Sequence, residues 1–343
     1  MKLLSIIIPI YNVEGYVERC ISSLADQDIA SEEYEIICIN DGSPDRSRDI
    51  VRNMQEKYNN IILIDQDNQG VSCARNNGID IATGNYLLFV DPDDFIEPNS
   101  LKRVLDTAEY YKCQVSFLGF TILSEEGKVR KRVLNSKNKG KIFEGTEAYY
   151  ISRGDGQTDP DRMWAVLVRR DFIDLHGLRY LSGVPFLEDG ELIARILCLA
   201  DRCIFDGHPF YNRTIRSGSA TQSSLFNSEK AIDGFLRAAC NLKTFQNTRD
   251  IKQRKRDFLN QPICKFTILV ITASTKPFKL RRIRNAKRRL CEEGFCKLSI
   301  KSTDIEYRIL GLLYNTSVYI LVSYQILIFS IRYTRSLISN LIR

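Results

Sequence analysis

The chain has 343 residues, enough for one large α/β domain and an appended segment. Apolar residues make up 44% of it and charged residues 27%, a balance that excludes a wholly disordered protein. The net charge of +7 favours an anionic partner, such as nucleotide phosphates, lipid headgroups or nucleic acid.

The first ninety or so residues alternate short apolar runs with amphipathic stretches. The runs predict four strands, at 3–8, 34–39, 61–64 and 86–90. Apolar residues at helical spacing predict helices at 13–24, 47–58 and 71–82. This alternation indicates a mostly parallel sheet, whose ligands bind beyond the carboxyl ends of the strands. The polar residues that follow each strand are therefore the candidates for chemistry.

The N-terminus has the features of a buried strand rather than of an export signal. Its apolar run is short, Pro9 interrupts it, and no small-residue cleavage site follows. Without export, the ten cysteines are expected to remain reduced. No C-x-x-C pair occurs, which argues against a zinc site.

The densest group of carboxylates follows the fourth strand, where Asp91, Asp93 and Asp94 surround Pro92. Like charges at one strand end are unfavourable unless a cation neutralises them. Carboxylate oxygens without a nearby His or Cys suit Mg²⁺ or Mn²⁺, which bridge such groups to substrate phosphates. The alternative is a turn that only caps the next helix.

Other strand ends supply candidates for nucleotide binding. Tyr11 is placed to stack on a planar base, and Asp41 to accept hydrogen bonds from a base or ribose. Ordinary packing and a cap for the helix near Asp45 are the alternatives. Arg75, on the third helix, is a candidate for contacting a diphosphate, or else it faces solvent.

From about residue 101 the alternation of apolar runs and amphipathic stretches becomes less regular. It predicts a strand at 114–123, a basic hairpin at 125–141 and a helix at 146–152. A loop that enters a further helix is predicted at 186–200. Glu188 and Asp189 either complement the dipole of that last helix or supply a general base. Residues 211–219 predict a loop that closes over phosphates, or an ordinary surface turn.

Taken together these residues resemble family 2 glycosyltransferases with the GT-A fold, over about residues 3–221. The resemblance rests on SIIIPIYN, INDGSPD, NQGVSCARNNGIDIATGNYLLFVDPDD, FLED and YNRTIRSGS, in that order. It implies an α/β, Rossmann-like, mostly parallel sheet flanked by helices over residues 1–222. A nucleotide-sugar half would occupy about 1–112 and an acceptor half about 113–222. A helical, basic region, 223–343, would follow.

The resemblance also implies a role for each matching residue. The nucleotide sugar would be bound by Pro9, Tyr11, Asp41, Arg75, Asp91, Arg216 and Ser217. Asp93 and Asp91, the DXD motif, would hold the metal. Asp189 would be the catalytic base, with Glu188 beside it in the substrate site. The match departs at Pro92, where such proteins often carry Ser, without an expected loss of metal binding.

The implied function is that of an inverting, Mn²⁺- or Mg²⁺-dependent glycosyltransferase of bacterial surface-polysaccharide type. It would move a sugar from a nucleotide-diphosphate sugar, UDP being the best guess, to a saccharide or lipid-linked saccharide. Capsule, exopolysaccharide or lipopolysaccharide synthesis at the inner, cytoplasmic face of the plasma membrane is the implied setting. A metal-dependent nucleotidyltransferase and a non-catalytic nucleotide-sugar-binding module remain as alternatives. Nucleic acid is not an expected partner, because the basic cluster lacks interleaved aromatics.

The C-terminal region contains a basic cluster and an apolar stretch. Residues 276–289 surround the narrow stripe of Leu280, Ile283 and Leu290 with positive charge, which indicates a helix on anionic lipid. A solvated helix covering the catalytic domain is the alternative. Residues 309–331 are long enough to span a bilayer, but basic residues on both sides contradict the positive-inside rule. We therefore expect peripheral membrane contact rather than a span, with a buried core helix as the alternative.

Overall fold

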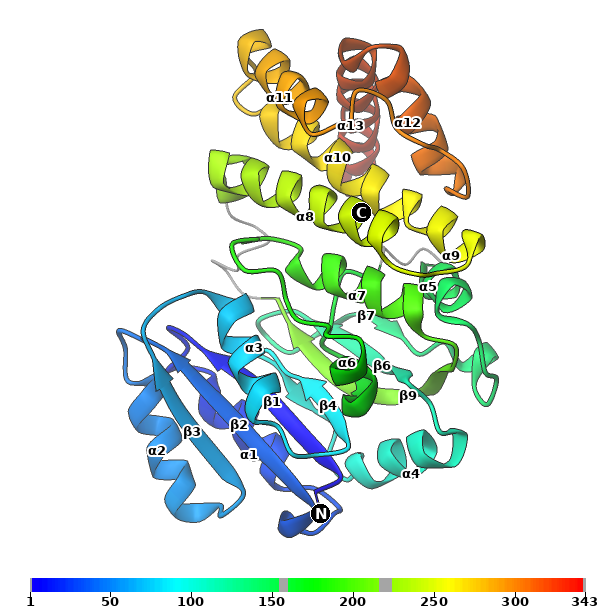
Figure 1. The fold of residues 1–343 in the computed structure, drawn as a ribbon. Helices are drawn as coiled ribbons and strands as arrows, with labels where there is room; N and C mark the ends of the chain where they lie inside the picture. The colour runs from blue at the N-terminus through cyan, green and yellow to red at the C-terminus, as the bar shows by residue number, and fades with distance from the viewer. Residues whose placement is uncertain (1, 154–159, 216–223, 342–343) are drawn as a thin grey trace. The chain divides into compact units, whose positions relative to one another are not determined.

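The structure, a computed structural model, describes residues 2–153, 160–215 and 224–341. The chain forms two compact units, Met1–Ser219 and Ala220–Arg343. Figure 1 shows a sheet with helices in the first unit and helices alone in the second. The α/β fold class and the helical C-terminal region predicted from the sequence are confirmed.

The first part of the N-terminal unit is a parallel sheet built by alternating strands and helices. Its strands are β1 (Leu4–Ile10), β2 (Tyr34–Asp41), β3 (Ile61–Gln66) and β4 (Tyr86–Phe89). Its helices are α1 (Val17–Ala25), α2 (Ser47–Lys57) and α3 (Val71–Ile81). β1 lies between β2 and β4, and its register with β2 runs from Leu4↔Tyr34 to Ile10↔Asn40. Every residue of β1 is buried, because the sheet is covered on both faces there.

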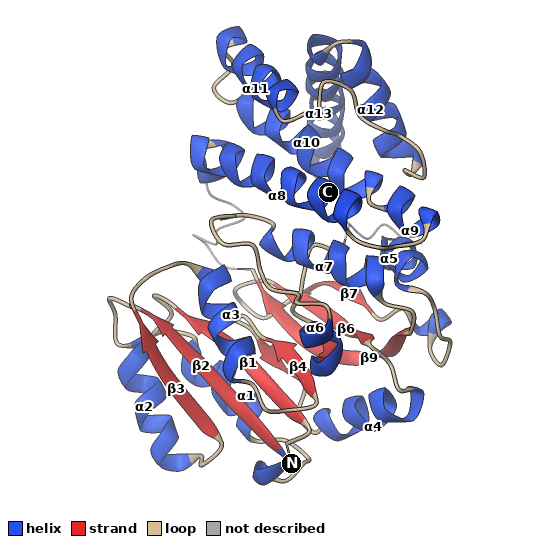
Figure 2. Ribbon diagram, viewed as in Figure 1, coloured by secondary structure: helices blue, strands red, loops and turns tan. Residues whose placement is uncertain are grey.

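The second part extends the same sheet with strands of both directions. Its strands are β5 (Phe95–Ile96), β6 (Val115–Leu123), β7 (Val129–Val133), β8 (Val166–Arg169) and β9 (Cys203–Thr214). Its helices are α4 (Leu101–Tyr111), α5 (Gly145–Arg153), α6 (Arg170–Leu175) and α7 (Glu188–Leu199). The strand order is β3-β2-β1-β4-β8-β6-β9-β5, with β7 paired to β6 (Figure 2). β8 runs antiparallel to both β4 and β6, so the sheet is parallel from β3 to β4 and mixed beyond.

Helix α3 packs closely on the central strand through a glycine. A Cβ atom added at Gly78 would collide with the side chain of Ile7 in β1. The absence of a side chain lets the helix approach the sheet, and the buried Arg75 lies one turn earlier on that helix. Gly78 therefore fixes the depth at which the Arg75 guanidinium lies.

The C-terminal unit consists of helices packed on one another. They are α8 (Glu229–Thr248), α9 (Gln253–Phe258), α10 (Asn260–Ser274), α11 (Leu280–Glu292), α12 (Ile305–Thr316) and α13 (Val318–Leu341). Phe235 of α8 meets Phe266 of α10 in its core. The apolar stretch 309–331 is divided between α12 and α13, which part at Ser317. Among the described residues, no helix is both long and apolar enough to cross a membrane.

The prediction of ten reduced cysteines is wrong for one pair. Cys291 and Cys296 form a disulfide, with their Cα atoms 4.2 Å apart. The turn that ends α11 reverses the chain and brings the two sulfur atoms together, which the spacing alone does not reveal. The other eight cysteines are free thiols.

Candidate active site

The carboxyl ends of the parallel strands lie at one edge of the sheet, and their loops are tied to one another. The Asn12 amide after β1 donates to Ser43 Oγ after β2 at 2.7 Å. Pro9 is buried within β1 opposite Ile39, while Tyr11, just beyond the strand, is 50% exposed. The Tyr11 ring is thus accessible at this edge, as stacking on a base requires.

Asp41 holds together the loop that leads into α3. Its carboxylate accepts hydrogen bonds from the Gln66 side chain at 2.7 Å and from the amides of Gln69 at 2.8 Å and Gly70 at 2.9 Å. The side chain is 3% exposed. Asp41 therefore positions the start of α3, a task that the sequence pattern did not predict.

Arg75 joins the end of β4 to the start of α7. Its Nη2 donates to Asp91 Oδ1 at 2.8 Å, and its Nη1 donates to Glu188 Oε1 at 3.0 Å and to Asp189 Oδ1 at 2.9 Å. The residue is 3% exposed and its guanidinium lies 5.2 Å from the centre of the Tyr180 ring. Burial opposes its charge, but the surrounding carboxylates hold the Arg75 pKa well above its ordinary value.

Asp189 is a buried carboxylate held from three sides. Its Oδ1 accepts hydrogen bonds from Arg75 and from the Tyr180 hydroxyl at 3.1 Å, and its Oδ2 accepts one from the Met163 amide at 2.9 Å. Burial raises the pKa of Asp189 to about 6, against the opposing effect of Arg75. Leu187, with φ of 58°, turns the chain so that Asp189 falls in the first turn of α7.

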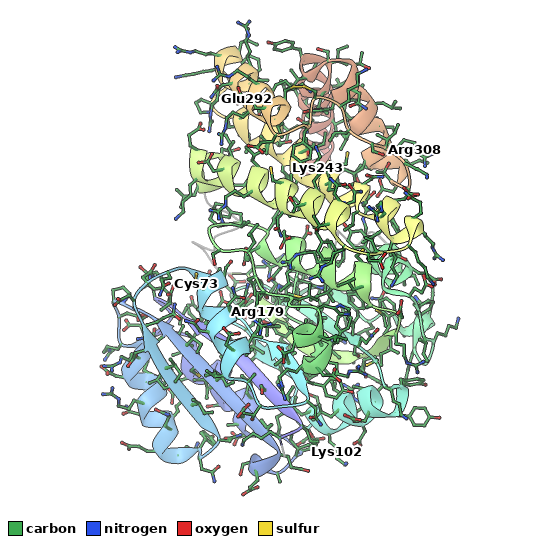
Figure 3. All side chains as sticks on the ribbon, viewed as in Figure 1. Cys73, Lys102, Arg179, Lys243, Glu292 and Arg308 are labelled. Atoms are coloured by element: carbon green, nitrogen blue, oxygen red, sulfur yellow. A yellow bond between two sulfur atoms is a disulfide. The ribbon has the colours of Figure 1, made fainter. Side chains whose placement is uncertain are left out.

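The loop that precedes α7 lies along α3. Asn76 and the backbone of Tyr180 exchange two hydrogen bonds, at 2.8 and 2.9 Å. Arg179 donates to Asp80 at 2.9 Å; Figure 3 labels Arg179 beside this helix. These contacts position Tyr180 so that its hydroxyl reaches Asp189. The sequence pattern missed both Tyr180 and Met163, because neither belongs to a periodic or charged motif.

The three carboxylates after β4 have different surroundings. Asp94 is 2% exposed and accepts hydrogen bonds from the Tyr211 hydroxyl and the Thr214 amide, both at 2.8 Å. Burial raises the pKa of Asp94 well above its ordinary value, and Asp91 and Asp93 raise it further. Asp91 and Asp93 remain partly exposed. Asp94 thus docks β9 against the β4 turn, while Asp91 binds Arg75.

The predicted loop at 211–219 is wrong in its first part. Residues 211–214 are the end of β9, where Tyr211 and Asn212 pair with β5. The hydrogen bonds to Asp94, 117 and 120 residues away, stabilise a strand that local sequence does not specify. Arg216 and Ser217, predicted to lie over the phosphates, fall outside the described residues.

Asp91 and Asp93 are suited to share a divalent metal with a ligand rather than to enclose one. Within the described ranges, no cluster of three or more His, Cys, Asp and Glu side chains is arranged to hold a metal ion. Asp91 Oδ1 is occupied by Arg75, while its side chain stays 29% exposed. Partly exposed carboxylates fit Mg²⁺ or Mn²⁺ that completes its shell with water and phosphate oxygens.

Comparisons with known proteins show similarity to glycosyltransferases. The family model described as glycosyl transferase family 2 matches residues 5–171. The uncharacterized glycosyltransferase EpsJ of Bacillus subtilis is 27% identical over 90% of this chain and 88% of its own length. The minor teichoic acid biosynthesis protein GgaB of the same organism is 39% identical over 39% of this chain, which spans only 15% of GgaB.

The fold also matches a solved structure. Staphylococcus aureus TarS 1–349, in complex with UDP-GlcNAc, superposes with a TM-score of 0.70 over 95% of this chain and 92% of that chain, at 20% sequence identity. At this identity the likeness shows the shared fold.

Proposed function

Since this chain belongs to glycosyl transferase family 2 through residues 5–171, we propose that it transfers a sugar from a UDP-sugar to an acceptor hydroxyl with inversion. One observation carries the proposal. Arg75 brings Asp91, at the end of β4, and Asp189, at the start of α7, to the same guanidinium. A carboxylate suited to a metal and a carboxylate suited to proton removal therefore face one space.

The chemistry of the site follows from Asp189. The carboxylate takes the proton of the acceptor hydroxyl while that oxygen forms a bond to the anomeric carbon. The bond from this carbon to the diphosphate oxygen breaks on the opposite side, and its electron pair leaves with the nucleoside diphosphate. Attack opposite the leaving group inverts the anomeric centre. Arg75, Tyr180 and the Met163 amide hold the base in place.

Asp91 and Asp93 would hold Mn²⁺ or Mg²⁺ against the donor diphosphate. When bound, the ion supplies positive charge that stabilises the departing diphosphate. In the same proposal Tyr11 stacks on the base beside Pro9, and Arg216 and Ser217 contact the phosphates. UDP is favoured because a protein of the same fold, TarS, was solved with UDP-GlcNAc.

We expect donor binding to depend on the metal through Asp93. Calorimetry should show UDP-GlcNAc binding to the wild-type chain with Mn²⁺ and at least tenfold weaker binding in EDTA. Asp93→Asn should lose this difference, because a neutral amide is a poorer ligand for a hard cation. The exposed Asp106→Asn on α4 is the control. Equal affinity with and without metal in the wild type would contradict the metal assignment, and GDP-mannose in a parallel titration tests the nucleotide.

The acceptor is proposed to be a saccharide or lipid-linked saccharide of a bacterial surface polysaccharide. The names of the relatives support this class, since GgaB is a teichoic acid biosynthesis protein. The C-terminal unit offers a surface that would bring the enzyme to such an acceptor at a membrane.

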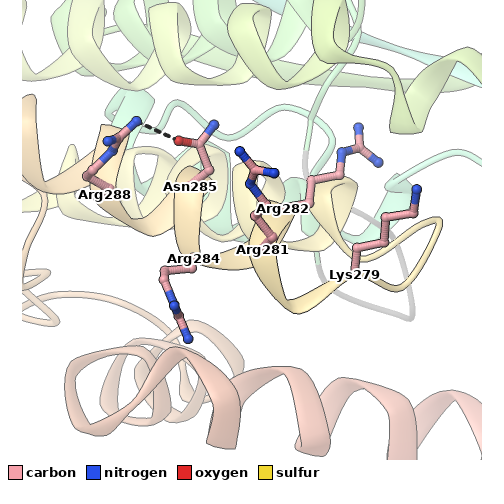
Figure 4. Close-up of a pocket in the computed structure, with 6 residues that line it drawn as sticks. All are labelled: Lys279, Arg281, Arg282, Arg284, Asn285 and Arg288. Atoms are coloured by element: carbon pink, nitrogen blue, oxygen red, sulfur yellow. Dashed lines mark hydrogen bonds between the residues drawn. The ribbon is translucent and has the colours of Figure 1, made fainter.

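That surface combines positive charge with exposed apolar side chains. In Figure 4, Lys279, Arg281 and Arg288 extend to one side of α11 and Arg284 to the other, around a groove of about 670 Å³. The inner face of α11 is apolar, with its buried residues at Ile283, Ala286 and Leu290. The same unit exposes apolar side chains at Phe278, at Leu280 in α11, at Ile305 and Leu312 in α12, and at Ile326, Leu327 and Phe329 in α13. Basic and apolar groups together suit an anionic lipid surface.

We expect the full chain to sediment with vesicles that contain phosphatidylglycerol and to be released by high salt. Each Lys or Arg near an anionic surface is worth about 1 kcal/mol, so Lys279→Ala with Arg281→Ala should weaken binding by about tenfold or more. A double variant on the exposed β7 edge, Arg130→Ala with Lys131→Ala, is the matched control. Equal binding to neutral phosphatidylcholine vesicles would count against this contact.

A further inference from the structure

Arg162 is a buried cation whose Nε has no hydrogen-bond partner among the described residues. The residue is 6% exposed, and the neighbouring Asp161 carries the opposite charge. Burial and, to a smaller extent, the nearby Arg213 lower the pKa of Arg162 to about 10, against the opposing effect of Asp161. A buried guanidinium with an unsatisfied donor is costly, and an oxyanion bound beside it would accept that hydrogen bond.

Aromatic rings shape the surroundings of this guanidinium. It lies 4.6 Å from the centre of the Phe120 ring and 5.7 Å from that of Trp164. A second cation, Arg213 on β9, lies 5.4 Å from the centre of the same Trp164 ring. Trp164 stacks on Tyr211 at 5.0 Å. Two guanidinium groups therefore flank one indole, an arrangement that the rings stabilise only in part.

The arginine pair, Arg162 and Arg213, lies beside the proposed reaction centre. Met163, between Arg162 and Trp164, donates its amide to the base Asp189 at 2.9 Å. Trp164 forms a bridge with Phe89 at the end of β4. The Tyr211 hydroxyl under Trp164 binds Asp94 and accepts a hydrogen bond from the Asp91 amide. The pair is thus linked both to the base and to the turn that carries the DXD motif.

We propose that Arg162 and Arg213 bind an oxyanion, a phosphate or carboxylate, on the acceptor, next to the hydroxyl that receives the sugar. Guanidinium groups match the oxygens of such anions with paired hydrogen bonds. We assign the anion to the acceptor because the arginine pair adjoins the base, where the attacking hydroxyl must lie. Asp91 and Asp93 are assigned to the donor. This inference rests on the proposed function for its placement of the acceptor.

Trp164 is the single tryptophan of the chain, so its fluorescence reports on binding at this site. Tryptophan emission would be followed while the full chain is titrated with glycerol 3-phosphate, inorganic phosphate or glucuronate at constant ionic strength. Glycerol and glucose serve as neutral controls. We expect a saturable change with a phosphate or carboxylate probe and none with neutral probes. The anion class that binds with the higher affinity, phosphate or carboxylate, identifies the group on the acceptor.

Arg162→Met should weaken anion binding at least tenfold, since a hydrogen bond to a charged group is lost while the side-chain volume is kept. Arg213→Met, at a less buried position, gives a second variant if the first folds poorly. Arg130→Met on exposed β7 should change nothing. Unchanged anion affinity in both pair variants, or a wild-type response no larger than that to chloride, overturns the proposal.

A second experiment tests whether the arginine pair binds the donor or the acceptor. Calorimetry with UDP-GlcNAc and Mn²⁺ should give the same affinity for the wild type and Arg162→Met, while transfer to an anionic acceptor shows a raised KM. Loss of donor affinity in the variant would assign the pair to the donor diphosphate and overturn the proposal. The fluorescence titration needs no sugar transfer, so its failure is distinguishable from failure of the proposed function.

Discussion

Replacing Asp189 by Asn is expected to lower the rate of sugar transfer by about 10²–10⁴-fold, the contribution typical of a general base. The amide cannot take the proton of the acceptor hydroxyl. Donor affinity, measured by calorimetry with UDP-GlcNAc and Mn²⁺, should stay within about twofold, because Asp189 acts on the acceptor while Asp91 and Asp93 are assigned to the donor. One of three hydrogen bonds is lost at the Met163 amide, which lowers stability without unfolding the chain.

Glu188→Gln is the matched control. Glu188 adjoins the base and receives a hydrogen bond from the same Arg75 Nη1, but its side chain is 15% exposed against 9% for Asp189. We expect its transfer rate to fall much less. Wild-type turnover in Asp189→Asn, or a larger loss of transfer rate in Glu188→Gln than in Asp189→Asn, would show that Asp189 is not the base.

The pH profile gives an independent reading of the same residue. Burial raises the Asp189 pKa to about 6, so its carboxylate form is abundant above this pH and scarce below it. Transfer should therefore fall about tenfold per pH unit below pH 6, as the base becomes protonated. An acid limb near pH 4 would mean that an ordinary, exposed carboxylate limits the rate.

Arg75→Met is expected to cost about 3–5 kcal/mol of folding free energy, the range found when one partner of a buried ion pair is removed. The change leaves Asp91, Glu188 and Asp189 near one another without their shared cation. Urea denaturation at pH 7.5 measures the loss. Arg48→Met removes the exposed pair with Asp65 and should cost far less than Arg75→Met, because solvent screens exposed ion pairs.

The loss in Arg75→Met should depend on pH with a definite sign. Without the cation, burial and mutual repulsion raise the pKa of these carboxyls above their unfolded values. Their ionisation then destabilises the folded state at neutral pH, and the penalty decreases as pH falls through the raised pKa values. A penalty that grows on acidification, or a penalty no larger than that of Arg48→Met, would contradict the central role given to Arg75.

The amino-acid sequence alone predicts the alternation of strands and helices in the first part of the chain and the acidic turn after β4. These features depend on residues close together in the chain: a β-branched run forms a buried strand, and polar residues must lie where it ends. The match of residues 5–171 to the glycosyl transferase family 2 model depends on the same local motifs. The helical nature of residues 224–341 was also evident from local spacing.

Which side chains contact one another depends on the three-dimensional fold. Arg75 and Asp189 are 114 residues apart, and nothing in their local surroundings specifies their contact. The three aspartates after β4 look equivalent in sequence, yet Asp94 binds β9, Asp91 binds Arg75, and Asp93 stays partly exposed. β9 itself is a strand because distant partners satisfy its backbone. Partner choice depends on the path of the whole chain, which local propensity does not contain.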